Sequence, residues 1–479
     1  MTPPKGRWYK WEVLLIACIG SMMAPLDSSI IGVSLPEISQ SLGMDYASVI
    51  WVPTAYLVTI AALLLSFGRL SDMIGRKWLY IIGFGIFTAG SVACSFSSDG
   101  TQLIASRVSQ GVGGAFMMSV SPALITAAFP GEDRGKALGI NALFVYVGLS
   151  MGPPLGGFLT DAYGWPSIFL VNIPIGIVVV ALAAIVIKDD SRRTHRDFDI
   201  KGAVLFSVAL VSFLLALTFA EELGWSSIYV LGGLALAIGA GAVFAVIEKG
   251  LGENAMLNID LITKNRLFAA ANTSALLNYT AFFGVNFIIS FYLQRVLSLT
   301  LVETGFILLV MPVMMAIFAP ISGWLSDRYG SRILATSGML IISFGLLLLA
   351  TLNESSDPSQ VMAMLLIIGF GMGVFSSPNT SAIMGCVRKD QLGQASGVLS
   401  TMRTVGQSLS LAIMGAIISI VASPGIVTAV FSGGDASLVE IGEFVDGMRV
   451  AFFVGAVISL VGAGISSVRG NSSDDSCPP

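Results

Sequence analysis

The chain has 479 residues and a net charge of −4, and 55% of its residues are hydrophobic while only 11% are charged. Soluble globular proteins carry about 25% charged residues, so the composition excludes a protein whose surface is covered by water. The sparse negative charge also argues against a nucleic-acid partner.

Cysteine and histidine are too few and too scattered for the common metal and catalytic sites. Cys18, Cys94, Cys386 and Cys477 form no C-x-x-C pair, and His195 is the only histidine. A zinc site, a disulfide framework and a histidine-based catalytic centre are therefore not expected. We expect no metal, no cofactor and no enzyme activity.

Long apolar runs follow one another along the chain. The first begins at Val13 after Lys5, Arg7 and Lys10, and it lacks a cleavage pattern, so we interpret it as a retained helix. A membrane-spanning helix needs about 20 apolar residues. Fourteen runs are long enough, near residues 12–34, 47–67, 78–97, 102–125, 137–160, 167–187, 200–221, 228–248, 267–293, 302–325, 333–352, 360–385, 394–421 and 446–468.

The positions of lysine and arginine orient these spans. If both termini are cytoplasmic, every basic residue except Arg107, Arg295, Arg403 and Arg449 lies on the inner side. This separation fits the positive-inside rule for membrane proteins. Removing two adjacent spans would keep the fit, so twelve spans remains the rival count.

The chain therefore divides into two six-helix halves with two inserted helices. We expect a first half over residues 1–187, a central pair with polar linkers over 188–266 and a second half over 267–468. Residues 469–479 are short and polar, which is typical of a disordered cytoplasmic tail.

A charged hairpin occurs at the same place in each half. The sequence GRLSDMIGRK at 68–77 returns as GWLSDRYGSR at 323–332, and each copy lies between two apolar runs. Glycine permits a tight turn, and a carboxylate among basic residues can act as a conformational latch. The predicted gating residues are Gly68, Arg69, Asp72, Gly75, Arg76, Lys77, Gly323, Asp327, Arg328 and Gly330.

These loops resemble the signature of the major facilitator superfamily. The segments LDSSIIGVSLP at 26–36, RVSQGVGGA at 107–115, GLSMGPPLGG at 148–157 and GWPSIFLVNIP at 164–174 are similar to motifs of its fourteen-span drug/proton antiporter branch. Gly32 and Ser29 depart from the Asn and Thr of that pattern. The resemblance implies an all-α membrane bundle and multidrug efflux.

Asp27 is the leading candidate for the functional carboxylate. An ionisable group inside the membrane is costly and is a functional candidate by default. The resemblance implies that Asp27 couples transport to protons or recognises a cation. Arg107 lies at a similar predicted depth, so an Asp27–Arg107 pair is expected, either as a proton-coupling element or as a static packing pair.

Further candidates come from the fifth span and from the second half. Glycines and proline in the fifth span predict close helix packing, and the resemblance assigns this antiporter helix to sealing the cavity, through Gly148, Gly152, Pro153, Gly156 and Gly157. The predicted substrate cavity contains Gln110, Asn278, Phe282, Asn286, Asn379 and Met384. Arg403 is assigned to gating or packing.

The sequence thus predicts a monomeric secondary transporter in the plasma membrane, with both termini cytoplasmic. It would export lipophilic, cationic small molecules in exchange for protons, with the proton gradient as its energy source. The alternatives are an exporter of one metabolite, lipid or siderophore, proton-coupled uptake, and a membrane sensor or scaffold. A soluble output domain, which is expected of a sensor, is missing from the sequence.

Overall fold

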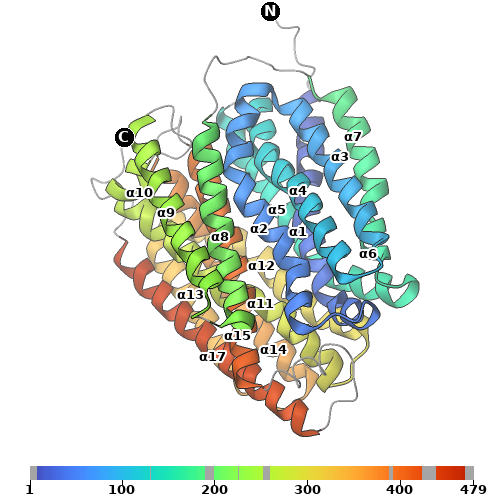
Figure 1. The fold of residues 1–479 in the computed structure, drawn as a ribbon. Coiled ribbons are helices and arrows are strands. Elements are labelled where there is room, and N and C mark those ends of the chain that lie inside the picture. The colour runs from blue at the N-terminus through green and yellow to red at the C-terminus, as the bar shows by residue number, and fades with distance from the viewer. Residues whose placement is uncertain are drawn as a thin grey trace, which may run out of the picture.

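The described part of the computed structural model is almost entirely helical (Figure 1). It describes residues 8–129, 131–188, 199–224, 226–251, 259–387, 392–422 and 438–469. Fourteen helices in these ranges are long and apolar enough to cross a membrane, which agrees with the predicted fold class and span count.

The first half contains six spans, the last of which is divided into two helices. They are α1 (Tyr9–Ser41), α2 (Tyr46–Ile74), α3 (Arg76–Ser95), α4 (Gly100–Ala128), α5 (Gly131–Tyr163), α6 (Ser167–Leu170) and α7 (Asn172–Val186). Helix α1 continues through Pro25 and Pro36 and extends beyond the span expected near residues 12–34. Each proline leaves one carbonyl of the preceding turn without its helical N–H partner, which a membrane helix tolerates within a bundle.

The inserted pair forms two full-length helices at one side of the bundle (Figure 1). They are α8 (Ile200–Leu223) and α9 (Ile228–Leu251), followed by the short α10 (Ile259–Lys264). Helix α8 packs on helices of both halves, and the Ser207 hydroxyl donates to the Ala62 carbonyl of α2 at 2.9 Å. The pair therefore lies along the seam between the halves.

The second half repeats the arrangement of the first. It contains α11 (Arg266–Phe291), the π-helix η2 (Tyr292–Val296), α12 (Leu301–Tyr329), α13 (Ser331–Leu349), α14 (Pro358–Gly385), α15 (Leu392–Val421) and α17 (Leu438–Val468). The two repeated hairpins have similar backbone conformations at the turn. Gly75 joins α2 to α3 at φ 110°, and Gly330 joins α12 to α13 at φ 85°, values that side chains other than glycine rarely adopt.

The two halves meet through several helix pairs. Helix α5 packs against α12, α2 packs against α15, and α1 meets α11 and η2. At the last contact, Gln294 Nε2 donates to the Val33 carbonyl at 2.9 Å and Arg295 Nη2 donates to the Pro36 carbonyl at 3.2 Å. These bonds join the halves on the side opposite to the repeated basic hairpins.

Candidate functional site

The two predicted membrane charges form an ion pair inside the first half. Arg107 Nη1 on α4 lies 2.5 Å from Asp27 Oδ2 on α1, and neither side chain is exposed. An ionic pair in a low-dielectric interior is stable only if its remaining hydrogen-bonding capacity is satisfied. The neighbours of the pair therefore decide what it can do.

Amide side chains complete the environment of the carboxylate. Gln110 Nε2 donates to Asp27 Oδ1 at 2.8 Å, and Asn172 Nδ2 donates to the same oxygen at 2.9 Å. Both amides also donate to the Ser91 hydroxyl of α3, at 2.9 and 3.2 Å. We call Asp27, Arg107, Gln110, Asn172 and Ser91 the buried polar cluster; it joins α1, α3, α4 and α7.

Arg107 is held by α2 as well as by Asp27. Its Nε donates to the Val52 carbonyl at 3.1 Å, and its guanidinium carbon lies 4.1 Å from the centre of the Tyr56 ring. A cation over an aromatic face gains attraction from the ring quadrupole. Arg107 Nη2 and Tyr56 Oη are buried without a hydrogen-bond partner, so the arginine retains one donor for a changed arrangement.

The sequence left two possible roles for Asp27, proton coupling and recognition of a cation, and this geometry distinguishes between them. The carboxylate accepts hydrogen bonds from three side chains and is closed to solvent, so a cationic cargo cannot contact it in this conformation. A proton, however, would cancel its charge and weaken the contact with Arg107. Gln110, which was predicted to line the substrate cavity, belongs instead to the buried polar cluster.

The glycine and proline residues of α5 let it lie directly against two helices. A Cβ atom at Gly148 would lie 2.5 Å from the Met22 carbonyl oxygen, and one at Gly156 would lie 2.6 Å from that of Ile30. At Gly152 it would overlap the Ser29 hydroxyl. Larger residues would thus push α5 away from α1.

The opposite face of α5 contacts α12 of the second half in the same way. A Cβ atom at Gly157 would lie 2.5 Å from the Leu301 carbonyl oxygen, and one at Gly305 would lie 2.6 Å from that of Pro153. The glycines of α5 thus let it pack closely between α1 and α12. All five predicted residues of the antiporter helix fall in this contact region.

The repeated hairpins have the expected turns, but only part of their predicted chemistry is described. The side chains of Arg69, Asp72 and Asp327 lie outside the described residues. Lys77 Nζ donates to the Ala184 carbonyl of α7 at 2.7 Å, and Arg328 stacks on Trp324 with 4.2 Å between guanidinium and ring centre. The first glycines of the two hairpins differ in their surroundings. A Cβ at Gly68 would meet no atom within 4 Å, whereas one at Gly323 would lie 2.5 Å from the Ser377 hydroxyl.

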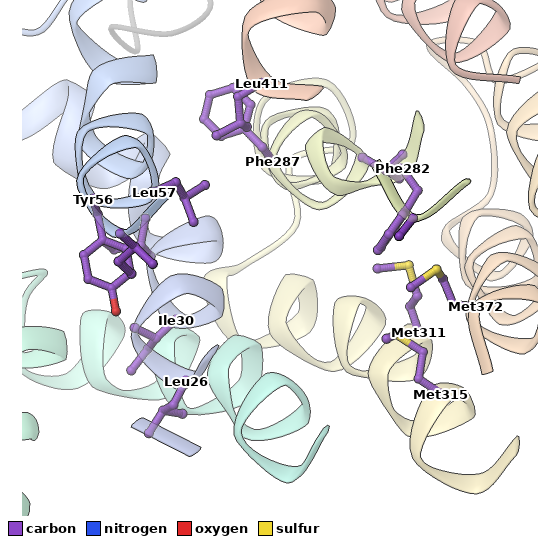
Figure 2. Packing of buried hydrophobic residues seen from close by; sticks show 14 of the residues in the cluster. Leu26, Ile30, Tyr56, Leu57, Phe282, Phe287, Met311, Met315, Met372 and Leu411 are labelled. Atoms are coloured by element: carbon purple, nitrogen blue, oxygen red, sulfur yellow. The ribbon is translucent and has the colours of Figure 1, made fainter. Parts of the chain in front are cut away.

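Among the predicted cavity residues, Asn278 and Phe282 lie on α11 beside a group of methionines. Figure 2 shows Met311, Met315 and Met372 gathered near Phe282. Asn278 Nδ2 lies 3.1 Å from the Met372 sulfur, and Asn278 Oδ1 has no hydrogen-bond partner.

Asn286 and Met384 are half-buried, and Asn286 Oδ1 also has no hydrogen-bond partner. Asn379, in contrast, is engaged within the second half. Its Nδ2 donates to the Ala271 carbonyl at 3.1 Å, and its Oδ1 accepts a hydrogen bond from Arg469 Nη1 at 2.9 Å.

Arg469 was assigned to the tail, but it is 1% exposed and packs inside the second half. Burial, together with the charge of Arg332, lowers the pKa of Arg469 to about 10, so it stays charged near neutral pH. The rest of the predicted tail, residues 470–479, lies outside the described residues.

Arg403 lies at a second polar position, where the two halves touch. Its Nη2 donates to the Thr380 hydroxyl of α14 at 2.6 Å. One turn away on α14, the Ser376 hydroxyl lies 2.9 Å from the hydroxyl of Tyr146 on α5. Sequence reasoning missed Tyr146 and Ser376 because single hydroxyls in membrane helices usually bond within their own bundle.

Comparisons with known proteins agree with this architecture. The family model described as Major Facilitator Superfamily matches residues 17–259, 200–411 and 271–469. A solved structure of a bacterial homologue of the human lysosomal transporter Spinster, inward-facing and unoccupied, superposes with a TM-score of 0.69 over 97% of both chains. At 16% identity, that likeness concerns the fold.

Curated relatives are transporters by name. The chain is 35% identical to the riboflavin transporter RibZ of Clostridioides difficile, over 84% of this chain and 87% of that protein. It is 31% identical to the multidrug resistance protein Stp of Mycobacterium tuberculosis, over 85% and 75% of the two chains. The tetracenomycin C resistance and export protein of Streptomyces glaucescens is also 31% identical, over 87% of this chain and 78% of its own.

Together, the fourteen helices, the duplicated hairpins and these matches have one explanation. The chain belongs to the Major Facilitator Superfamily, within its multidrug efflux-type branch, and it is a membrane transporter rather than an enzyme.

Proposed function

We propose that this transporter is a proton-coupled antiporter that exports lipophilic small molecules across the cytoplasmic membrane. The observation that carries the proposal is the buried polar cluster, in which Asp27 is the carboxylate and Arg107 its counter-ion. A carboxylate that accepts from donors on α4 and α7, within a cluster that joins four helices, is suited to exchange a proton for a change in helix packing.

The coupling step follows from the charges of the cluster. Protonation of Asp27 removes the negative charge that holds Arg107 Nη1, and it turns one acceptor oxygen into a donor. Gln110 and Asn172 then lose part of their acceptor set. Because these residues belong to α1, α4 and α7, a change in proton occupancy alters how these helices pack and biases which side the transporter faces.

Helix α5 would keep this exchange free of leak. Its glycine contacts bring it close to α1 and α12, and such close packing leaves little room for water between the helices. A tight seal is needed because an antiporter loses its gradient if protons cross without cargo. This is the sealing role that the sequence resemblance implied for the antiporter helix.

The cargo is expected to be lipophilic, with no requirement for positive charge. The prediction of a cationic cargo depended on Asp27 facing the cavity, and the enclosed carboxylate removes that reason. Phenylalanine and methionine side chains such as Phe282, Met311 and Met372 can adapt to cargoes of different shapes (Figure 2). Relatives named for multidrug resistance support a broad cargo range.

A second candidate is transport of one dedicated metabolite by the same mechanism. Its support is the 35% identity to a protein named as a riboflavin transporter. A planar, polar ring system of that kind would also fit an aromatic and methionine-lined wall. The two candidates differ in breadth of cargo rather than in mechanism.

The proposed setting is the plasma membrane, with both termini cytoplasmic because the basic hairpins and linkers then lie inside. Protons, a small-molecule cargo and lipid are the expected partners, the working unit is a monomer, and the proton gradient replaces any cofactor.

The test uses proteoliposomes loaded with rhodamine 123, riboflavin or fluorescein, which are cationic, neutral and anionic fluorescent compounds. The proposal expects efflux of at least one probe to accelerate when the outside is made acidic, and a protonophore to abolish the acceleration. Asp27→Asn should lose it. Equal efflux with and without a gradient would contradict antiport, and transport of riboflavin alone would favour the dedicated transporter.

A further inference from the structure

Arg403 is a positive charge for which the described chain provides no acid. Its Nη2 bonds to the neutral Thr380 hydroxyl, and its Nε is buried without a hydrogen-bond partner. None of the described carboxylates forms an ion pair with it, whereas Arg107 has Asp27. Arg403 is half-buried and its Nε is closed to solvent, and a cation in that position without a counter-ion is costly, so an anionic group would stabilise the site.

The position of Arg403 places this charge where transport would open the molecule. Thr380 lies one turn from Ser376 on α14, and Ser376 bonds to Tyr146 of α5 across the boundary between the halves. Separation of α5 from α14 would break that bond and would expose the neighbouring guanidinium. The Nε of Arg403 is closed to solvent in the present conformation, and rocking of the halves would give a cargo access to it.

An aromatic surface leads away from the guanidinium. The Arg403 guanidinium carbon lies 5.8 Å from the Tyr279 ring centre, and the Tyr279 and Phe282 rings are 5.5 Å apart. Gly406 allows this approach, because a Cβ there would lie 2.9 Å from Tyr279 Cβ. Phe282 then continues into the group of methionines seen in Figure 2, which includes Met311.

The first-half residues labelled in Figure 2 carry no charge; they are Leu26, Ile30, Tyr56 and Leu57. Asp27 is fully buried and paired with Arg107 in its own cluster. The described residues at this boundary therefore combine one positive charge with aromatic and sulfur-containing walls.

We propose that Arg403 recognises the cargo, and that its site takes planar aromatic compounds bearing a carboxylate or another anionic oxygen. Such a compound would stack along Tyr279 and Phe282 and place its anionic end on the guanidinium, whose planar donors match a carboxylate. This inference rests on the proposed export of lipophilic compounds and specifies their charge. It replaces the gating or packing role that the sequence suggested for Arg403.

Fluorescein and rhodamine 123 test the proposal directly, because they share a planar xanthene skeleton and carry opposite charges. Their affinities for the purified full-length protein in detergent are measured by fluorescence polarisation. The wild type should bind fluorescein more tightly than rhodamine 123. Arg403→Gln should weaken fluorescein binding by about tenfold, the effect of losing one hydrogen bond to a charged group, and leave rhodamine 123 within about twofold.

Arg449→Gln is the matched control, because it removes an arginine that is exposed and paired with Asp446 far from this boundary. It should leave both affinities within about twofold. A wild type that binds neither probe or prefers rhodamine 123 would overturn the proposal. So would an Arg403→Gln protein that keeps its fluorescein affinity or loses both probes equally.

Arg403→Lys is a second, more conservative variant that keeps the proposal testable if Arg403→Gln misfolds. Gel filtration and thermal unfolding check the fold of both variants. The lysine variant keeps the charge but loses the planar fork of donors, so fluorescein should still be preferred, with several-fold lower affinity. Unchanged affinity would contradict direct contact with the guanidinium. These binding assays need no gradient, so a failure of proton coupling would appear only in the proteoliposome test with Asp27→Asn.

Discussion

Asn172 and Asp27 are 145 residues apart, yet Asn172 Nδ2 donates to Asp27 Oδ1 at 2.9 Å in the interior of the first half. This bond ties the last span of that half to the first. It makes Asn172 a positioning residue for the proposed coupling carboxylate, and the proposed mechanism gives it a measurable effect.

Asn172→Leu should shift the pH dependence of transport without stopping it. The carboxylate loses one of its three donors, so the charged form of the cluster is less well stabilised and the pH profile of transport should change. Hydrogen bonds to charged groups contribute about 1.5–3 kcal/mol, so gradient-driven transport at a fixed pH should change by about tenfold. Cys94→Ala is the control, since the thiol donates to Gln110 Oε1 at 3.6 Å and not to Asp27. The same pH profile of transport in both variants would contradict the role of Asn172.

Tyr56 should act through its ring and not through its hydroxyl. The hydroxyl is buried without a hydrogen-bond partner, whereas the ring faces the Arg107 guanidinium at 4.1 Å. Tyr56→Phe should therefore leave the thermal unfolding midpoint unchanged or slightly raised, because no hydrogen bond is lost. Tyr56→Leu should lower it, since the cation–π contact is worth about 2 kcal/mol when desolvated. Equal losses in the two variants would show that the hydroxyl has a partner.

Gly152 should tolerate no larger residue, although alanine favours helices. A Cβ at Gly152 would lie 2.7 Å from Ser29 Cβ and 2.8 Å from the Ile30 nitrogen, so Gly152→Ala must separate α5 from α1. Overpacking of this kind costs about 1–3 kcal/mol and should appear as a lower unfolding temperature and faster proton leak. Gly139→Ala is the control on the same helix, since a Cβ there would meet no atom within 4 Å and should stabilise by up to about 1 kcal/mol. A more stable Gly152→Ala protein would contradict the packing account.

The hydrogen bonds of Gln294 and Arg295 should hold the halves together on the proposed outer side. Gln294 bonds to the Val33 carbonyl, and Arg295 bonds to the Pro36 carbonyl and to Gln40 Oε1 at 3.2 Å. The double variant Gln294→Ala with Arg295→Ala removes these bonds while α5 and α12 stay in contact. The population that is open on this side should therefore increase.

Distances between spin labels at Ser98 and Ser355, measured by double electron–electron resonance, test this expectation. Both residues are exposed, and they lie on the same side of the molecule in different halves. The double variant should show a larger long-distance population than the wild type. Arg449→Ala removes a neighbouring exposed charge and should give the wild-type distribution. Identical distributions for all three proteins would show that these bonds do not set the conformation.

The sequence predicted the fold and the central ion pair well because both follow from the cost of polar groups in lipid. Apolar length gives the spans, and the rarity of charge makes Asp27 and Arg107 conspicuous. Asn172 and Ser91 were not found, because uncharged polar residues are common in membrane helices and their partners depend on helix rotation. Rotation is set by packing that apolar periodicity does not encode.

The same limitation explains the misplaced residues. Gln110 lies one turn from Arg107, so it turns with the arginine into the cluster and not towards the other half. Arg469 stands at the start of a polar stretch in the sequence. Only the packing of α17 shows that its side chain reaches Asn379. Contacts between helices could be predicted where a membrane charge required a counter-ion. They could not be predicted where the contact is a single hydrogen bond to a neutral group.

Proton movement itself tests the central claim most directly. A pH-sensitive dye trapped inside proteoliposomes reports protons that cross when a transported probe is added outside, while exchange of labelled probe at equal pH reports cargo movement. The account predicts that the wild type moves protons against cargo, and that Asp27→Asn still exchanges cargo but moves no protons. Proton movement by Asp27→Asn equal to that of the wild type would contradict the assignment of coupling to Asp27.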